Sequence, residues 1–200
     1  MTTTSTKLIV LRVTKYSEAD LIVTGLTPDF GKLSLIARGA SRSKKRFSGG
    51  LLEATHALQV EFKKSQREQS LSTLVEARLT EDFSQLRTKY DRLQTALRLL
   101  EVMTKISQEG DPHSQNLYHL TGHSLKVLQE VQDFGLFWIH FVIRLLLNQG
   151  VLVQEAWMMP FLDKAMAHHT QLDIRPNGIA QDVHERAQRA LDRYLESCSI

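Results

Sequence analysis

Cysteine is nearly absent from this chain. Its 200 residues include a single one, Cys198, close to the end of the sequence. One thiol excludes an intramolecular disulfide framework and a cysteine zinc cluster. Such sparing use of cysteine is typical of proteins in a reducing compartment. We therefore expect no bound zinc or other metal.

Long apolar runs are also lacking. The most apolar stretch, residues 134–153, is interrupted at His140, Arg144, Asn148 and Gln149. A membrane-spanning helix needs about 20 largely uncharged residues, so this stretch predicts a buried helix instead. The N-terminus has no basic lead followed by a cleavable apolar segment. We expect a cytoplasmic protein without a membrane segment.

No motif for catalysis or nucleotide binding is complete. Residues 25–32 have five residues between their glycines and are followed by Leu33, whereas a phosphate-binding loop has four and then Ser or Thr. His119 and His123 share a helix face without a third ligand in register, so a polar helix surface explains them better than a metal site. There is no Gly-x-Ser-x-Gly motif. These absences predict a protein that is not an enzyme and has no cofactor.

Positive charge is present but unevenly distributed. Residues 1–75 contain 12 Lys or Arg and 6 Asp or Glu, whereas residues 76–200 contain 13 and 16. Five basic residues fall within nine positions that contain no acid: Arg38, Arg42, Lys44, Lys45 and Arg46. Such a cluster fits a polyanionic partner, and it fits equally a solvated loop whose charge maintains solubility. The run alone leaves both interpretations open.

The first 78 residues have the pattern of short strands. Leu58, Val60 and Phe62 alternate with Gln59 and Glu61, as in a half-buried strand. Similar apolar or β-branched segments predict strands at residues 8–13, 21–24, 31–37, 56–62 and 71–77. Five short strands in so few residues favour a small closed or nearly closed β-barrel. Residues 41–50 are rich in Ser, Lys, Arg and Gly and predict a mobile loop.

Helical periodicity follows the strands. Five apolar residues spaced 4, 3, 4 and 3 predict an amphipathic helix: Leu86, Tyr90, Leu93, Leu97 and Leu100. Thr80 or Asp82 is its candidate cap, and residues 109–112 end it. Further helices are predicted at 117–131, at 134–149, at 154–169 with a bend or break near Pro160, and from Asn177 onward. The prediction is an α+β chain, with a barrel domain at 1–78 and an all-α helical bundle domain at 79–200.

Arg144 interrupts the most apolar predicted helix. A charge on a buried helix must reach solvent along its stem or meet a carboxylate or carbonyl oxygens. Glu101 and Glu130 are candidate partners on neighbouring helices. We therefore predict a structural role for Arg144.

Four segments near the start of the chain resemble the opening of the RecO family of bacterial recombination mediators: residues 10–11, 16–20, 27–33 and 37–40. Further matches follow at residues 50–53, 76–77, 113–120 and 141–146, so that the similarity covers most of residues 8–152. Each match is short, and their common order and spacing make the resemblance specific.

The resemblance implies a fold and a function. The fold is an N-terminal OB-fold β-barrel followed by a helical domain. The function is that of a nucleoid-associated DNA repair and recombination mediator that binds single- and double-stranded DNA and anneals complementary strands. Its implied partners are RecR and the tail of the single-strand binding protein, and it helps to load recombinase onto strands covered by the latter. Many family members also carry a four-cysteine zinc module, whereas residues 151–173 contain no cysteine.

Basic and aromatic residues of the barrel half are the candidate DNA contacts. Lys and Arg neutralise phosphates without reading sequence, and aromatic rings stack on bases. The candidates for phosphate binding are Arg38, Arg42, Lys44, Lys45, Arg46, Lys15, Lys32, Lys63 and Lys64. The candidates for stacking are Tyr16 and Phe47, although Phe47 fits at least as well a loop residue that packs back on the core.

A protein-interaction adaptor is the alternative function. In that case basic and apolar surfaces of the chain bind acidic protein tails without direct DNA contact. Competition by short oligonucleotides separates the two functions. Binding of residues 38–46 to anionic lipid is less well supported, because no amphipathic apolar face adjoins them.

Overall fold

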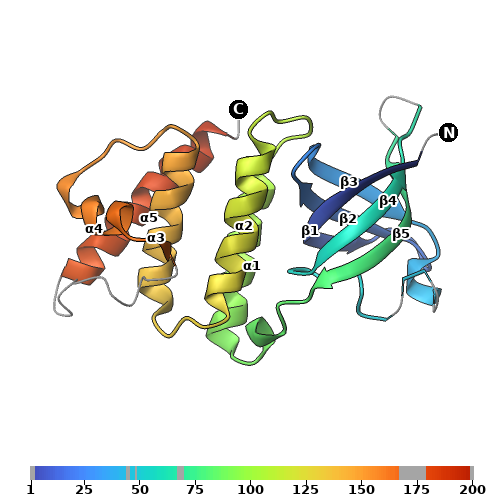
Figure 1. The fold of residues 1–200 in the computed structure, drawn as a ribbon, viewed down its shortest axis with the longest axis horizontal. Coiled ribbons are helices and arrows are strands. Elements are labelled where there is room, and N and C mark those ends of the chain that lie inside the picture. Colours follow the sequence, from blue (N-terminus) through green and yellow to red (C-terminus); the bar gives the residue numbers. More distant parts are fainter. Residues whose placement is uncertain (1–2, 44–45, 48, 67–69, 167–178, 199–200) are drawn as a thin grey trace. The chain divides into compact units, whose positions relative to one another are not determined.

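The computed structural model describes residues 3–43, 46–47, 49–66, 70–166 and 179–198. Strands come first and helices follow (Figure 1). The chain divides into two compact units. The barrel unit consists of Met1–Phe83 and Leu99–Gly122, and the helical unit consists of Ser84–Arg98 and His123–Ile200. The domain boundary proposed between residues 78 and 79 stays a prediction.

The barrel contains all five predicted strands. They are β1 (Thr3–Lys15), β2 (Leu21–Thr27), β3 (Gly31–Ala37), β4 (Ala57–Lys63) and β5 (Ser72–Glu81). They close in the order β1-β2-β3-β5-β4, with β3 and β5 parallel. The long β1 pairs with β4 along its first half and with β2 along its second, and its register shifts between Val10 and Arg12. This bulge lets one strand bend to serve both neighbours.

Alternating side chains of the strands fill the barrel. Leu58, Val60 and Phe62 are at most 3% exposed, while Gln59 and Glu61 stay partly exposed. The predicted period-2 pattern of this strand is therefore confirmed. Burying a large apolar side chain contributes about 1.5–3 kcal/mol, so these inward rows supply much of the stability of the barrel.

The turn between β2 and β3 packs on the loop that joins α1 (Tyr90–Ile106) to α2 (Ser114–Leu128). The Lys32 N–H donates to the Gln108 carbonyl at 2.9 Å, and the Gly110 N–H donates to the Phe30 carbonyl at 2.9 Å. Gly31 adopts a positive φ of 67°, and a Cβ at this position would collide with the Gln108 carbonyl oxygen. The turn therefore requires glycine for its conformation and for its close approach.

The helical unit surrounds α3 (Phe134–Asn148), the predicted buried helix. Asp133 caps its start by accepting the Leu136 N–H at 2.9 Å. Gly150, with φ 68°, ends it, and its N–H donates to the Leu147 carbonyl at 3.0 Å. The last helix, α5 (Ile179–Ser197), contributes the buried residues Val183, Ala187 and Leu191.

The buried face of α1 differs from the prediction. Tyr90 is 77% exposed and Leu97 is 46% exposed, and Leu86 belongs to the preceding 3-10 turn η2 (Ser84–Arg87). The face that is buried has the same 4, 3, 4, 3 spacing at Arg92, Ala96, Leu99, Met103 and Ile106. The predicted caps are also wrong, because Thr80 lies in β5 and Asp82 lies well before Tyr90. The predicted period is therefore right; the predicted stripe is right at Leu86 and Leu100, which are at most 1% exposed, and wrong at Tyr90 and Leu97.

The predicted helix at 154–169 is also different. The chain forms a short 3-10 turn, η3 (Ala156–Met158), and then α4 (Met159–Asp163), with Pro160 in the first turn. Proline fits this position because its missing N–H has no helical partner there. Residues 167–169 and the predicted start at Asn177 lie outside the described residues.

Arg144 of α3 is bound inside the helical unit. Its Nη2 donates to the carbonyls of Leu162 at 3.1 Å and Lys164 at 2.6 Å, and its Nε donates to His140 Nε2 at 3.3 Å. The predicted structural role is confirmed, with carbonyl oxygens in place of the suggested Glu101 or Glu130. Arg144 thereby fastens the end of α4 to α3.

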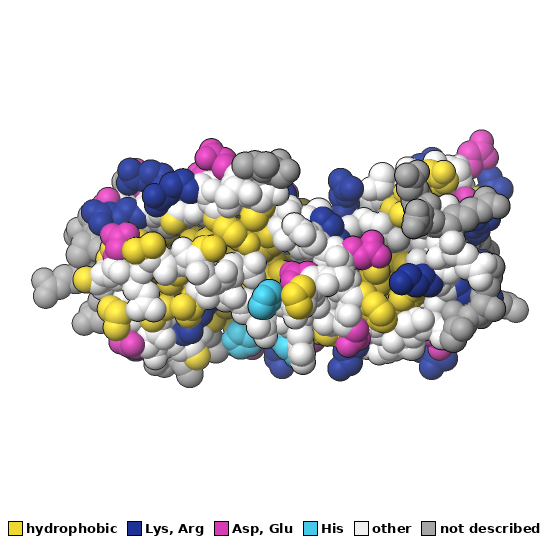
Figure 2. Space-filling model, turned by 90° about the horizontal axis from the view of Figure 1, so that it is seen from above, with side chains coloured by type: hydrophobic (Ala, Val, Ile, Leu, Met, Phe, Trp, Pro, Cys, Tyr) yellow, Lys and Arg dark blue, Asp and Glu magenta, His cyan; other side chains and the backbone are white. Residues whose placement is uncertain are grey.

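Among the described residues, no helix is both long enough and apolar enough to cross a membrane. Figure 2 shows Lys and Arg side chains interspersed with acidic and hydrophobic ones over the face it presents. On this face, positive charge alone therefore does not mark a functional surface.

Candidate nucleic-acid interface

Two chain segments meet at one end of the barrel. The first is the turn at residues 16–20 between β1 and β2, which is closed by the Tyr16 N–H donating to the Asp20 carbonyl at 3.0 Å. The second begins at Arg38, directly after β3, and includes the 3-10 turn η1 (Ala40–Arg42). Leu21 pairs with both Lys15 and Ala37, which places the two segments side by side.

Hydrogen bonds join these segments. The Gly39 N–H donates to Asp20 Oδ1 at 2.8 Å, and the Ser41 N–H donates to the Ala19 carbonyl at 3.0 Å. Gly39 has φ 68°, a left-handed conformation in which the chain leaves β3 for η1. The start of the predicted mobile loop is thus fixed to the neighbouring turn.

The segment after β3 carries three exposed arginines, Arg38, Arg42 and Arg46, which we call the rim arginines. Arg42 Nη2 lies 3.1 Å from Glu18 Oε2, with the two side chains 71% and 90% exposed. Arg46 Nη2 donates to the Arg38 carbonyl at 3.2 Å. Exposed ion pairs contribute only about 0–1 kcal/mol, so a phosphate can replace Glu18 at Arg42.

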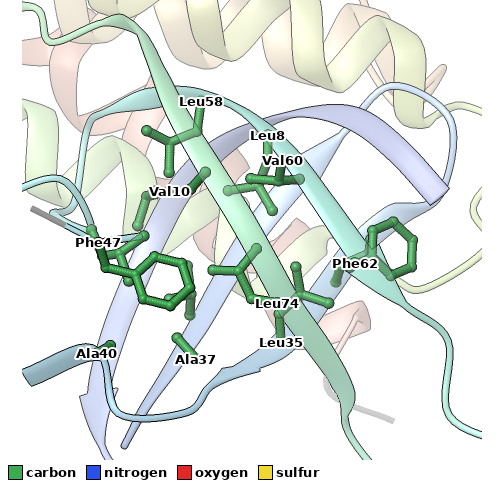
Figure 3. Packing of buried hydrophobic residues seen from close by; sticks show 14 residues of the cluster. Leu8, Val10, Leu35, Ala37, Ala40, Phe47, Leu58, Val60, Phe62 and Leu74 are labelled. Carbon is green, nitrogen blue, oxygen red and sulfur yellow. The ribbon is translucent and has the colours of Figure 1, made fainter. Parts of the chain in front are cut away.

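Phe47 is not a base-stacking residue in this structure. Its side chain is 3% exposed and belongs to the barrel core, where Figure 3 shows its ring pointing toward the interior near Ala37 and Ala40. Arg46 lies over the ring, 5.4 Å from its centroid. The alternative interpretation, a loop residue that packs back on the core, is confirmed. Phe47 anchors the loop that carries Arg46.

Lys32 also has a different role from the predicted one. Its Nζ donates to the Thr104 carbonyl at 2.9 Å, in the last turn of α1, and the side chain is only partly exposed. A positive charge is favourable there because unpaired carbonyls make the end of a helix negative. The ammonium group therefore binds α1, which removes Lys32 from the candidate phosphate contacts.

The strand register places two of the other lysines near the rim arginines. Lys63 pairs with Thr73, which pairs with Ile36, two residues before Arg38. On the opposite side of β3, Lys15 pairs with Leu21 of β2, which pairs with Ala37 at the end of β3. Neighbouring strands are about 4.8 Å apart, so each lysine starts roughly 10 Å from the end of β3. Lys64 is exposed beyond the end of β4.

Lys44 and Lys45 lie outside the described residues. Tyr16, the other predicted stacking residue, is 63% exposed in the turn beside the rim arginines. It is therefore available to a base, in contrast to Phe47.

Arg12 is a further exposed basic residue of the barrel that the sequence patterns did not single out. This exposed residue lies on β1 opposite Thr24, which is opposite Ser34 on β3. The two hydroxyl groups are 3.2 Å apart and make this part of the outer face polar. The available signal was a charged residue in an otherwise apolar strand segment.

The described residues contain no group of three His, Cys, Asp or Glu side chains placed to hold a metal ion. His119 and His123 are both exposed on α2, as expected for polar helix-surface residues. The expectation that the protein holds no zinc stays a prediction.

A second candidate surface is a groove in the helical unit with a volume of about 450 Å³. Its lining is mostly apolar and includes Leu146, Val151, Val153 and Met158, with one acid, Glu155, and one base, Arg193, also part of it. A neighbouring cavity of about 630 Å³ contains three arginines and four acids of α5 and of the segment before α4. Its Arg186 is paired with Asp182 at 3.0 Å and with Glu155 at 3.8 Å. Charges in this region are therefore largely balanced.

Comparisons with known proteins place the chain in a family. Residues 1–83 match the family model described as Recombination protein O N terminal. The chain is 36% identical over 128 residues to the DNA repair protein RecO of Syntrophus aciditrophicus, covering 64% of this chain and 48% of that protein. It is 32% identical over 152 residues to that of Syntrophobacter fumaroxidans, covering 76% and 59%. The chain thus spans about half the length of these relatives.

The closed barrel, the helical region that follows it and the match over residues 1–83 together define an OB-fold protein with a helical second part. The chain belongs to the RecO family. The predicted fold class, an OB-fold barrel followed by helices, is confirmed.

Proposed function

We propose that this chain is a non-enzymatic mediator of DNA recombination that acts in the cytoplasm at the nucleoid. It binds single- and double-stranded DNA, anneals complementary strands and helps to load recombinase onto strands covered by the single-strand binding protein. Partnership with RecR is part of the proposal and rests on family membership alone.

The observation that carries the proposal is the set of rim arginines. Their guanidinium groups are exposed, and hydrogen bonds from Gly39 and Ser41 order the start of the loop that bears them. Guanidinium groups bind phosphate oxygens through two parallel hydrogen bonds. OB-folds bind oligonucleotides across β2–β3 and through the loops after β1 and β4. The rim arginines, Tyr16 and Lys64 lie in or beside these regions.

Annealing then needs no catalytic group. Two complementary strands repel each other through their phosphates, and bound arginine and lysine side chains reduce this repulsion. Base pairing supplies the remaining free energy. Contacts to phosphate alone are independent of sequence, as an annealing protein requires.

Titration of labelled single-stranded DNA over a salt series tests the proposal. We expect the triple variant Arg38→Gln, Arg42→Gln, Arg46→Gln to bind more weakly and to reduce the salt slope by about 2 units, if each arginine contacts one phosphate. The matched control is Arg186→Gln, Arg189→Gln, Arg193→Gln on α5, which removes the same charge. Equal losses in both variants would show that net charge rather than the rim determines binding.

The second candidate function is binding of an acidic protein tail, such as that of the single-strand binding protein. The mostly apolar groove near Arg193 favours it, because an apolar terminal side chain fits the groove and a carboxylate can pair with Arg193. We expect Val153→Asp, at an 80% exposed residue of the groove, to weaken binding of such a tail peptide and to leave DNA affinity unchanged. Loss of DNA binding in this folded variant would contradict the separation of the two surfaces.

A further inference from the structure

Two carboxylates in the turn at residues 16–20 make opposite kinds of contact. Glu18 pairs with Arg42 through two highly exposed side chains, at 3.1 Å. Asp20 instead accepts the backbone N–H of Gly39 through Oδ1 at 2.8 Å. The two residues carry the same charge in the same turn, and only one of them binds backbone.

The backbone contact lies at the centre of a local network. The Asp20 N–H donates to Ser17 Oγ at 3.1 Å, and the Asp20 carbonyl accepts the Tyr16 N–H at 3.0 Å. The Asp20 side chain thereby joins the turn that carries Tyr16 to the backbone of Gly39, next to Arg38. The Ser41 N–H bond to the Ala19 carbonyl, at 3.0 Å, is the other backbone link between these segments.

We propose that Asp20 is a positioning residue of the DNA-binding rim, whereas Glu18 is an internal competitor that a DNA phosphate displaces from Arg42. The inference rests on the proposed function, because it assigns opposite effects on DNA binding to two acids of the same site.

Charge alone predicts something else. Both carboxylates repel phosphate, and both lie within a Debye length of the rim, so removing either should strengthen binding equally. Geometry separates them. Without the Asp20 acceptor, the segment from Arg38 to Arg42 is less ordered in the free protein. DNA binding must then order it, and the conformational entropy lost in that step weakens the complex. Without Glu18, Arg42 keeps its position and loses only a weak, exposed partner.

Three variants with the same net charge test the proposal: Glu18→Ala, Asp20→Ala and Asp20→Asn. In a titration with labelled single-stranded DNA, we expect Glu18→Ala to bind about two- to fivefold more tightly, as the loss of an exposed pair allows. Asp20→Ala should bind about three- to tenfold more weakly despite its added positive charge, because a hydrogen bond to a charged group is lost. Asp20→Asn keeps an oxygen that can accept the Gly39 N–H and should bind at least as tightly as the unmodified chain.

A second measurement does not depend on DNA. Hydrogen exchange of the Gly39 amide in the free protein should be faster in Asp20→Ala and unchanged in Glu18→Ala. Circular dichroism confirms that each variant is folded. If Asp20→Ala does not fold, Asp20→Ser, which also removes the carboxylate, is judged by the same criteria.

Equal strengthening of binding by Glu18→Ala and Asp20→Ala would overturn the inference, and so would equal weakening by Asp20→Ala and Asp20→Asn. Unchanged exchange at Gly39 in Asp20→Ala would also overturn it. Failure of the proposed function gives a different result. In that case the unmodified chain would not bind DNA, or the triple rim variant would bind DNA as tightly and with the same salt slope as the unmodified chain. Faster exchange of the Gly39 amide in Asp20→Ala would still be expected.

Discussion

The arginines of the barrel rim and those of the helical unit differ in what their guanidinium groups contact. Arg42 and Arg46 are exposed and bind one exposed carboxylate and one loop carbonyl. Arg92 is 5% exposed and donates to the carbonyls of Gln85 and Val131 and to the Thr88 hydroxyl, each at 3.2 Å. Arg144 binds two carbonyls and a histidine ring nitrogen.

This difference shows that arginine content alone does not locate a DNA surface. A guanidinium group whose donors are bound to carbonyls within the fold stabilises the fold and has little left to offer a phosphate. One at an exposed rim contributes little to stability and keeps its donors accessible. Substitutions in the two regions should therefore separate stability from DNA affinity.

The largest effect on stability is expected for Arg92→Met. Methionine keeps much of the stem volume, but the Val131 carbonyl loses its buried donor, whereas the Gln85 carbonyl still accepts the N–H and hydroxyl of Thr88. Leaving a buried carbonyl without its charged donor should lower the free energy of unfolding by about 2–3 kcal/mol. Urea unfolding followed by circular dichroism measures this loss. If Arg92→Met were stable but no longer bound DNA, Arg92 would be a DNA-binding residue and not a structural one.

Arg144→Met should cost less, because this arginine is only partly buried. The carbonyls of Leu162 and Lys164 lose a charged donor, and we expect a loss of about 2 kcal/mol in the free energy of unfolding. DNA affinity per folded molecule should stay unchanged. The control is Arg186→Met, whose exposed ion pairs predict a smaller change. If both variants unfold at the same urea concentration, the carbonyl contacts of Arg144 are not what stabilises α4.

Two exposed tyrosines offer a matched comparison of the two regions. Tyr16 is 63% exposed beside the rim arginines, and Tyr90 is 77% exposed at the start of α1. Stacking on a base contributes about 1–3 kcal/mol, so Tyr16→Ala should weaken single-stranded DNA binding about fivefold or more. Tyr16→Phe and Tyr90→Ala should bind as the unmodified chain does. A loss in Tyr90→Ala would extend the DNA surface to the helical unit.

Tyr118 predicts a pH effect in the barrel unit. Burial, together with the negative charge of Asp29, raises the pKa of its phenol above the ordinary value of 10.0. Folding thus favours the neutral phenol, and this contribution to stability is complete below pH 10 and is lost as pH rises through the folded pKa. In unfolding measurements above pH 10, Tyr118→Phe should lose stability less steeply than the unmodified chain. Parallel pH curves would contradict this account.

No effect at all is expected from a zinc chelator. The chain has one cysteine, so we expect elemental analysis to find no stoichiometric zinc after dialysis. Addition of EDTA should leave both urea unfolding and DNA binding unchanged. About one zinc per chain would contradict this prediction and would require ligands other than a cysteine cluster.

Sequence patterns predicted the barrel well because each strand encodes its own faces. Gly31–Ala37 was predicted with its observed bounds, and Leu58, Val60 and Phe62 were assigned to the correct face. The first helix shows the limit of this method. Apolar residues occupy two overlapping 4, 3, 4, 3 stripes, one through Leu93 and Leu97 and one through Ala96 and Leu99. Tertiary packing buries the second stripe together with Arg92, and from the first stripe it buries Leu100 but leaves Leu97 exposed.

The candidate site was predictable in part for a related reason. The cluster of basic residues in the sequence identified Arg38, Arg42 and Arg46, and arginine side chains are mostly exposed to solvent. The partners of Lys32 and Phe47 could not be predicted, because Thr104 and the barrel core are distant in sequence. Asp20 likewise could not be predicted as a partner of Gly39, because the two residues are 19 positions apart in the sequence.

The fit of Gly31 against the Gln108 carbonyl has a consequence for the barrel as a separate fragment. Gly31 and Lys32 bind a segment that comes after Ser84–Arg98 of the other unit, so the barrel unit is discontinuous along the gene. Transfer of the first 83 residues alone into another gene would separate the barrel from Thr104 and Gln108, to which Lys32 donates. We therefore expect a fragment of residues 1–83 alone to be less stable than the same barrel in the full chain, because Lys32 loses both of these acceptors.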